Sequence, residues 1–528
     1  MAKKIITIDS ILDGFSQTQY LSSKGSIDSS IGVDPDLPLT TTFTKASGMP
    51  VPSQYADFHG AGLSGAPMWV LTMNKGSTVY AYAADGEFIE YSSALTAASE
   101  LVIGTPTSGA GNGAAYYNNY IYLATPTNIS RYGPLDGGAT LTNTVWTGAT
   151  LGSQTAMTNT TYPSLRGVAL PNHPMHVHGD NALYVGDVLN GQGILHKIKT
   201  KKVTDEGDTN DGSSYDALDL PFGFIPIDIE AWGVDIVVLA VQTTNTTINQ
   251  GKAALFFWET TDTDTFYRGP VYLPDPLGTA LLNVNGILRI FSGNASSGVR
   301  VSKYIGGETI SDRDIDTEFL EDSLPPFAGA VDAFGSRGVW GGFSTYPENS
   351  ACVWSLGSKK GKVLMGLHNI VRATSTNPTN QIVTALKFVE QQDAITPKMV
   401  VGWKDNTTQG LDKYGTTGTI NSVWRTRFQN VGQKFQIIEI RVPLGKAVGA
   451  NMEIIPVVGL DDQSSTLALT TINNTNYTNS PRKVMYKEPD LPDVIGENNF
   501  WLEYNHGGTV TLPQLLPIKV TIETFDEE

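Results

Sequence analysis

Four of the seven histidines stand near one another in the chain, at His173, His176, His178 and His196. His176 and His178 are two residues apart, so in a β-strand both imidazoles point to the same face. Two imidazoles on one face are a workable pair of metal ligands. No nearby arrangement of Cys, Asp or Glu completes a coordination set. We therefore predict strand histidines without a metal, and ion binding at His176 and His178 is kept as the alternative.

The segment Asp205-Glu-Gly-Asp-Thr-Asn-Asp-Gly212 is rich in the oxygen ligands that Ca²⁺ prefers. Its spacing departs from that of a calcium-binding loop. After Asp208-x-Asn210 the pattern requires a residue that is not a ligand, and Asp211 stands there instead; no Glu follows at the right distance. We predict a solvated acidic loop between strands. Calcium binding at 205–212 is the alternative.

No motif of nucleophilic or nucleotide chemistry is recognisable, since the chain has no Gly-x-Ser-x-Gly elbow, Walker A loop or dinucleotide fingerprint after a strand. Paired carboxylates for glycoside hydrolysis occur in any chain with 52 Asp and Glu residues and do not indicate an activity. Gly335-Ser-Arg-Gly-Val-Trp340 resembles only the end of the Ser-x-Asp-x-Gly-x-x-Trp turn of propeller sialidases, and it lacks the Asp. Cys352 lies in an apolar segment and is predicted to be a small buried side chain. We expect no enzyme activity, no catalytic residues and no cofactor.

The elements that would position these residues are short β-strands. Segments rich in β-branched and aromatic residues are bounded by Gly, Asn, Asp or Pro, as in 77–82, 119–123, 235–241 and 254–258. The best short helix candidate covers 91–101, and it has no clear cap. The sequence predicts an all-β protein.

The strands recur with a period near 50 residues. One apolar anchor per copy can be placed at Trp69, Tyr116, His176, Ile229, Leu281, Val331 and Ile382, with spacings of 47, 60, 53, 52, 50 and 51 residues. About four strands per copy, with an apolar strand, a Gly/Asn turn and a second apolar strand, are typical of propeller blades. We predict a β-propeller of about seven blades over 49–415, with six or eight as alternatives.

The two ends of the chain do not follow this period. Residues 1–48 contain no strong hydrophobic block and predict an extended N-terminal arm that is ordered only where it lies on another element. Residues 416–528 contain five or more longer alternating strands, which predict a β-sandwich. Residues 1–48 and the sandwich are the predicted sites of inter-subunit contacts.

Composition excludes several classes of function. The 528 residues carry 35 Lys and Arg against 52 Asp and Glu, a net charge of −17, which disfavours wrapping nucleic acid by phosphate neutralisation. No apolar run approaches the roughly 18 residues of a membrane helix. One cysteine excludes an intrachain disulfide framework. Asp9 and Asp13 interrupt any signal-peptide core.

The chain resembles the β-propeller virion proteins of tailed bacteriophages, the ring or nozzle components near the tail. The resemblance lies in the blade endings Ile129-Ser-Arg-Tyr132, Ile194-Leu-His-Lys-Ile198 and Val301-Ser-Lys-Tyr304, and in the transition from Trp403 through Leu411-Asp-Lys-Tyr414 to Val423-Trp-Arg-Thr-Arg-Phe428. It is one of architecture over most of the chain.

This resemblance implies a virion structural protein that is made in the host cytoplasm. Copies of the chain would form a ring around the DNA exit path and dock adaptor and fibre proteins of the tail. Genomic DNA would pass through the lumen without specific binding, because acidic and neutral walls repel phosphate. The main alternative is a carbohydrate-binding adhesin in which Trp232, Trp258, Trp340 and Trp354 stack on sugars, although their apolar strands favour blade cores. A glycan hydrolase is the third alternative.

Overall fold

The structure is a computed structural model, and it describes a large part of the chain. The described residues are 2–8, 14–15, 26–31, 54–56, 63–72, 78–91, 100–106, 111–146, 164–165, 168–171, 173–199, 214–242, 251–260, 268–294, 298–315, 325–334, 337–344, 350–359, 362–369, 381–389, 398–405, 408–419, 422–426, 428–461, 465–489, 491, 494–507 and 515–525. Within them no helix is long and apolar enough to cross a bilayer.

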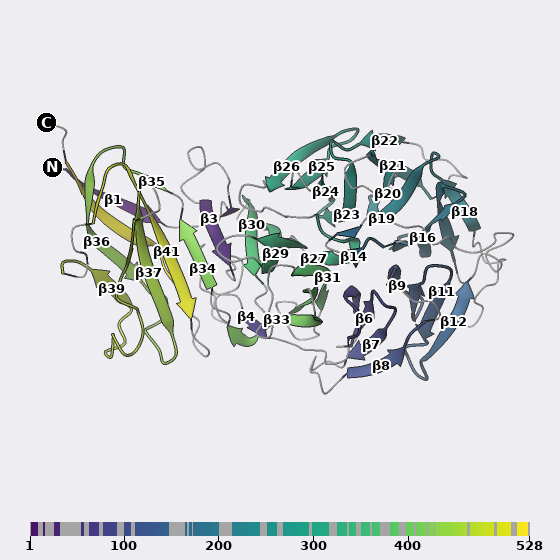
Figure 1. Ribbon diagram of the computed structural model, residues 1–528, viewed down its shortest axis with the longest axis horizontal. Helices are drawn as coiled ribbons and strands as arrows, with labels where there is room; N and C mark the ends of the chain where they lie inside the picture. Colours follow the sequence, from purple (N-terminus) through teal and green to yellow (C-terminus); the bar gives the residue numbers. More distant parts are fainter. Residues whose placement is uncertain are drawn as a thin grey trace. The chain divides into compact units, whose positions relative to one another are not determined.

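Within the described residues, seven sheets of four strands each are present, which confirms the predicted propeller of about seven blades (Figure 1). The strands of blades 1 to 4 are β5 (Pro67–Thr72), β6 (Val79–Ala83), β7 (Phe88–Tyr91), β8 (Glu100–Gly104); β9 (Gly113–Tyr117), β10 (Tyr120–Ala124), β11 (Ile129–Gly133), β12 (Thr140–Trp146); β15 (Met175–His178), β16 (Ala182–Leu189), β17 (Gln192–Ile198), β18 (Ser214–Asp219); β19 (Phe224–Trp232), β20 (Asp235–Gln242), β21 (Ala253–Glu259) and β22 (Arg268–Tyr272).

Blades 5 to 7 are built in the same way. Their strands are β23 (Leu277–Val284), β24 (Ile287–Asn294), β25 (Gly298–Tyr304), β26 (Thr309–Ile315); β27 (Val331–Phe334), β28 (Arg337–Ser344), β29 (Ser350–Lys359), β30 (Lys362–Asn369); β31 (Ile382–Val389), β32 (Lys398–Lys404), β33 (Gln409–Thr419) and β4 (Gln54–Ala56). The fourth strand of blade 7 therefore comes from residues that precede blade 1. A 3-10 turn, η3 (Ala328–Ala330), precedes β27, and β13 (Ser164–Leu165) pairs with β14 (Val168–Ala169) outside the blades.

Every anchor of the sequence repeat lies in the first strand of its blade. These first strands contact one another in blade order, and β31 contacts β5, so the ring of first strands is closed. The second and third strands are buried on both faces, as in β20 and β21, because each blade packs between two neighbours. Continuous apolar segments such as Ile236–Val241 follow from this double burial.

Asn and Gly make the tight turns between the first and second strands of blades 2 and 5. Asn118 and Asn119 have φ of 47° and 69° between β9 and β10, and Asn285 and Gly286 have φ of 53° and 77° between β23 and β24. Positive φ at both central residues gives the hairpin turn that matches strand twist, and Asn and Gly reach it at least cost. The helix predicted over 91–101 is wrong at both ends of that range. Tyr91 is the last residue of strand β7, and Glu100 is the first residue of strand β8. Residues 92–99 lie outside the described residues.

The remaining strands form a β-sandwich of two sheets, as predicted. One sheet has the order β1 (Ala2–Ile8), β42 (Ile518–Thr524), β36 (Phe435–Pro443) and β39 (Lys483–Tyr486), with β40 (Ile495–Gly496) also on β36. The other has the order β2 (Gly14–Phe15), β3 (Ser26–Ile31), β34 (Ser422–Thr426), β41 (Asn499–Gly507), β37 (Glu453–Leu460) and β38 (Ser465–Ala468), with β35 (Gln429–Asn430) on β41.

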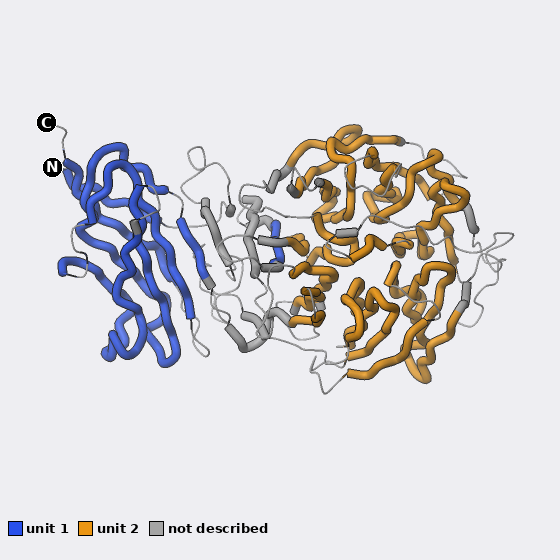
Figure 2. The backbone as a smooth tube through the Cα atoms, in the orientation of Figure 1, with its two compact units in different colours: residues 1–56, 352–371, 414–528 blue, residues 57–351, 372–413 orange. Residues whose placement is uncertain are grey.

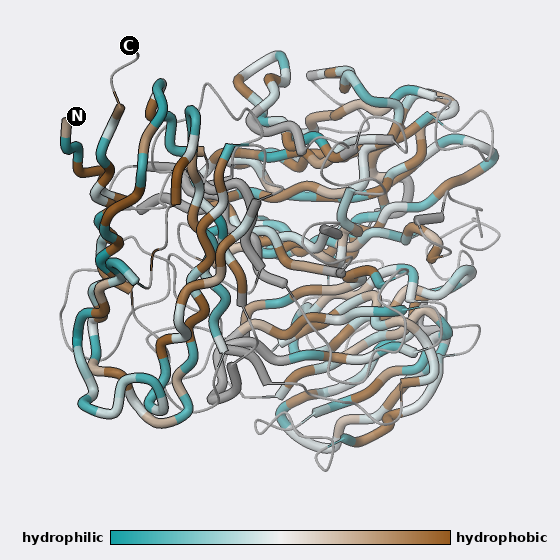
Figure 3. Tube along the Cα trace, turned by 60° about the vertical axis from the view of Figure 1, so that its left-hand side comes forward, coloured by the Kyte–Doolittle hydropathy of each residue, from teal (hydrophilic) through white to brown (hydrophobic). Residues whose placement is uncertain are grey.

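One hydrophobic core joins the two sheets of the sandwich. Ile6, Ile440 and Val520 enter it from the first sheet, and Trp424 and Phe500 from the second. The strands alternate between apolar and polar residues, as the colours along the chain show (Figure 3). Strands β1 and β3 of the predicted arm pair with β42 and β34 of the same chain, so these stretches are ordered against another element.

The chain divides into two compact units (Figure 2). Unit 1 comprises residues 1–56, 352–371 and 414–528, and unit 2 comprises residues 57–351 and 372–413. The first strands of all seven blades belong to unit 2. The boundaries predicted from the sequence, at 48/49 and 415/416, stay predictions.

Candidate functional site at the inner strands of the propeller

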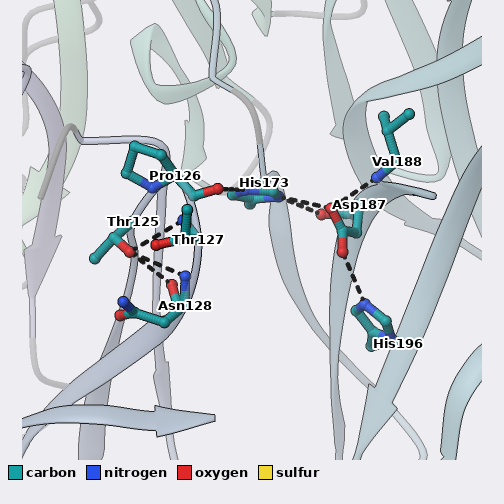
Figure 4. Close-up of polar contacts among 9 residues, drawn as sticks. Thr125, Pro126, Thr127, Asn128, His173, Asp187, Val188 and His196 are labelled. Atoms are coloured by element: carbon teal, nitrogen blue, oxygen red, sulfur yellow. Dashed lines mark hydrogen bonds and ion pairs between the residues drawn. The ribbon is translucent and has the colours of Figure 1, made fainter. Parts of the chain in front are cut away.

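Two of the four clustered histidines meet at a buried aspartate in blade 3 (Figure 4). His173 precedes β15, Asp187 lies on β16 and His196 lies on β17, and all three side chains are buried. The Asp187 carboxylate is 3.2 Å from His196 Nε2 and 3.6 Å from His173 Nδ1, and it accepts a hydrogen bond from Val188 N at 2.7 Å. The carboxylate thus links three successive segments of the blade.

The His173 ring also joins blade 3 to blade 2. Its Nδ1 lies 3.1 Å from the Gly186 carbonyl oxygen, and its Nε2 lies 3.3 Å from the Pro126 carbonyl oxygen in the turn between β10 and β11. The backbone N–H of His173 donates to the Asn112 carbonyl oxygen at 3.1 Å. Because a buried polar group without a partner is costly, these contacts fix the spacing of the two blades.

A similar polar group recurs in blade 5, which marks it as part of the blade architecture. Asp275 stands two residues before β23, as His173 stands two residues before β15. Ser292 on β24 donates to Asp275 at 2.8 Å, and Arg300 on β25 lies 3.6 Å from the same carboxylate. The position before the first strand therefore holds a buried polar residue in both blades.

His176 and His178 lie on β15 with ring centroids 6.2 Å apart. His178 Nε2 donates to the Val234 carbonyl oxygen of blade 4 at 3.0 Å. Burial, with His178 as a second cause, lowers the pKa of His176 to about 4, so this ring is neutral at pH 7. No group of three or more His, Cys, Asp or Glu within the described residues could hold a metal ion. The acidic segment 205–212 lies outside those residues.

Charged side chains gather on the first strands of blades 4, 6 and 7. Asp228 on β19 accepts hydrogen bonds from Ile229 N at 2.9 Å and from Leu281 N of blade 5 at 2.7 Å. Asp332 on β27 accepts from Lys387 Nζ of β31 at 2.9 Å and from Phe388 N at 2.7 Å. Both carboxylates thus join neighbouring first strands.

Burial among the first strands perturbs the acids of β19. It raises the pKa of Asp228 to about 8, against the hydrogen bond from Leu281 and with a smaller contribution from Glu230. It raises the pKa of Glu230 to about 7, where Lys387 opposes the shift and Asp332 adds to it. Glu230 therefore interacts electrostatically with groups on two other blades. These acids exchange protons near neutral pH.

Hydrogen bonds of this kind connect most neighbouring blades. Tyr117 donates to Asn181 O between blades 2 and 3, Asn283 to Ala231 O between blades 5 and 4, and Thr384 to Pro67 O between blades 7 and 1, at 3.0, 2.8 and 2.6 Å. With His178, Asp228 and Asp332 they form a polar belt around the ring of first strands. One oxygen of Asp228 and both oxygens of Asp332 accept hydrogen bonds from a neighbouring blade, so the arrangement binds the blades to one another.

The cysteine and three of the four tryptophans singled out in the sequence are buried. Cys352 is fully buried, which raises the pKa of its thiol well above the usual value. Trp258, Trp340 and Trp354 are buried in the blades and present no ring to a sugar. Trp232 is partly accessible and packs edge-on against Phe257 and Tyr304, with centroids 5.9 and 5.0 Å away.

Sequence analysis missed Asp187, Asp228, Glu230, Asp332 and Lys387. A signal for two of them was present, because Asp228 and Glu230 alternate with apolar residues in a first strand and so share one face of it. In a propeller that face can only meet other blades or the axis. The partners Asp332 and Lys387 lie about 100 residues or more further on, and no sequence period indicates their pairing.

Comparison with known proteins finds no matching family and only distant solved structures. No protein-family description and no curated protein matches the chain. Among solved structures, U3-55K aligns at 11% identity over 69% of this chain and 98% of its own, with a TM-score of 0.40. The β-propeller domain of Cps50 (Swd1) from Myceliophteria thermophila aligns at 10% identity over 67% and 99%, with a TM-score of 0.40. The WD40 domain of Pan2 from Neurospora crassa aligns at 8% identity over 69% and 95%, with a TM-score of 0.39. The neighbours are WD40 β-propellers, and the fold assignment here rests on the seven sheets themselves.

Proposed function

We propose that this protein is a structural assembly component, specifically a ring-forming tail protein of a tailed-phage virion. The observation that supports it best is the polar belt, in which carboxyl groups such as Asp228 and Asp332 accept hydrogen bonds from neighbouring blades. A propeller so constructed is a rigid body with large outer surfaces for neighbours. The fused sandwich adds a second such body, and the resemblance in the blade endings supplies the virion context.

In this proposal, copies of the chain surround the DNA exit path and carry adaptor and fibre proteins of the tail, after synthesis in the host cytoplasm. The net charge of −17 supports passage of DNA without retention, because an acidic wall repels phosphate at short range.

Sedimentation velocity over a concentration series tests this function. We expect one discrete oligomer of fixed size that grows at the expense of monomer. A chain that stays monomeric at every concentration and is retained on a glycan array would contradict it and favour the adhesin. In that case Trp232 is the tryptophan to replace first, because its ring is partly accessible at the propeller surface.

A further inference from the structure

Two strands stand at the edge of their sheets and pair on one side only within the described residues. Strand β1 (Ala2–Ile8) ends a sheet of the sandwich and pairs with β42, and β8 (Glu100–Gly104) ends blade 1 and pairs with β7. An edge of this kind presents a row of backbone N–H and C=O groups that can pair with an added strand.

Strand β1 is regular and widely exposed. Its seven residues pair with β42 one by one, without a bulge. Five of the seven are exposed, and Ile5 reaches 64%. Edge strands are usually protected by a bulge, a proline or charged side chains, and β1 has only Lys3 and Lys4 for this purpose. A neighbouring strand can therefore add to β1 if it neutralises the two lysines.

Strand β8 exposes apolar side chains on both of its faces. Leu101 is 56% exposed and Val102 is 51% exposed, and consecutive residues of a strand point to opposite faces. Among the described side chains on the fourth strands of the blades, only those of β8 include two consecutive apolar residues that are each more than half exposed. An added strand covers both residues at once, because its own side chains lie on both faces of the extended sheet.

The two edges are opposite in charge. Blade 1 lies within residues 63–106, whose charged residues are one basic and four acidic, a net charge of −3: Lys75, Asp85, Glu87, Glu90 and Glu100. The fourth strands of the flanking blades, β12 and β4, contain no charged residue. On β1, Lys3 faces Glu523 of β42, whereas Lys4 faces Ile522 and has no acid opposite it in its own sheet. A basic edge and an acidic edge attract each other.

One register of the two strands matches the charges and the apolar residues together. With residues 4–8 parallel to residues 100–104, Lys4 lies beside Glu100 and Leu101 lies beside an exposed isoleucine. Every further pair in this register is apolar or neutral. An antiparallel register that joins the same two charges overlaps over only three residues of each strand. The parallel register thus covers the exposed apolar side chains of both edges.

We propose that β1 of one copy adds to β8 of a second copy as a parallel strand. Two β1 edges side by side would bring four lysines together, and two acidic blades repel each other in the same way, so the contact between unlike edges is favoured. The contact is heterologous, and such contacts build closed rings or open filaments. The inference deepens the proposed function, on which it rests, by naming the strands that join the copies.

Intermolecular disulfides test this pairing in the full chain. Neighbouring residues on paired strands are about 5 Å apart, within the range of a disulfide, and the native Cys352 is fully buried. Ile5→Cys and Leu101→Cys are made as separate variants, mixed at equal concentration and oxidised with copper–phenanthroline. We expect a covalent dimer, cleaved by dithiothreitol, in the mixture and in neither variant alone. Circular dichroism checks that each variant is folded.

Two controls match these variants. Ile310→Cys on β26, the fourth strand of blade 5, is also exposed and should give no dimer with Ile5→Cys. Lys4→Glu places an acid beside an acidic blade and should weaken assembly about tenfold or more in sedimentation velocity. Lys483→Glu makes the same charge change on β39, at the far edge of the same sheet, and should leave assembly unchanged.

The outcomes separate this inference from the proposed function. A dimer that forms as readily with Ile5→Cys alone, or in the control mixture with Ile310→Cys, would overturn the pairing of β1 with β8. Wild-type oligomers without a dimer in the test mixture would also overturn it and leave the ring proposal standing. A wild-type chain that is monomeric at every concentration would overturn both proposals.

Discussion

Replacing Asp187 by alanine is the most informative test of how the blades are held together. The change removes the acceptor of Val188 N at 2.7 Å and the partner of His196 Nε2 at 3.2 Å, and it takes the carboxylate away from His173. Each buried donor left unsatisfied costs about 1–3 kcal/mol, so two of them cost about 2–6 kcal/mol.

We therefore expect Asp187→Ala to lower the free energy of unfolding of the propeller by about 4 kcal/mol, roughly a thousandfold in the unfolding equilibrium. Asp187→Asn keeps the volume and one carbonyl acceptor, and it should cost about 1–3 kcal/mol. Urea denaturation followed by fluorescence measures both. Asp136→Ala, at an exposed turn position of blade 2, is the matched control and should stay within about 0.5 kcal/mol of wild type. An Asp187→Ala variant as stable as this control would refute the structural role of the carboxylate.

Three further substitutions test other parts of the fold. Gly113→Ala places a Cβ on the His173 carbonyl oxygen between blades 2 and 3 and should cost about 1–3 kcal/mol in a urea melt, whereas Gly179→Ala, with open space around it, should cost little. Asp332→Ala removes the acceptor of Phe388 N and Lys387 and should cost about 1–3 kcal/mol by the same assay; a loss below that of Asp136→Ala would contradict a role in joining blades 6 and 7. Burial lowers the pKa of His506 to about 3, and Trp424 Nε1 donates a hydrogen bond to its Nε2 at 3.0 Å. As pH falls, the unfolded chain therefore takes up a proton at this histidine before the folded chain does. The free energy of unfolding of the sandwich should decrease as pH drops from about 6.5 towards 3. His506→Gln should flatten that fall in thermal melts at stepped pH, and an equally steep fall in the variant would show that another group causes it.

The propeller could be predicted from the sequence because apolar strands and Asn/Gly turns recur along the chain once per blade. Trp69, Leu281 and Ile382 mark first strands because each lies in an apolar segment that a turn separates from a second apolar strand. The contribution of β4 to blade 7 could not be predicted, because Gln54–Ala56 is too short to carry a pattern and its partner strand lies more than 350 residues away. The pairing of β1 with β42 could not be predicted either, because the two strands lie at opposite ends of the sequence.

The polar groups between blades were harder to predict than the blades. His173 and His196 drew attention as potential ligands, and the sequence gives no sign that Asp187 lies between them. Their meeting depends on the register of β16 against β17, in which Val185 faces His196. A one-residue shift of that register would turn each side chain to the opposite face of the sheet. Such contacts are a property of the packed blade, whereas the strand pattern is local.

Negative-stain electron microscopy of the full chain at several concentrations tests the central claim most directly. Assembly of copies into a tail ring predicts closed rings of fixed symmetry with a central channel. Lone discs at every concentration would contradict that claim.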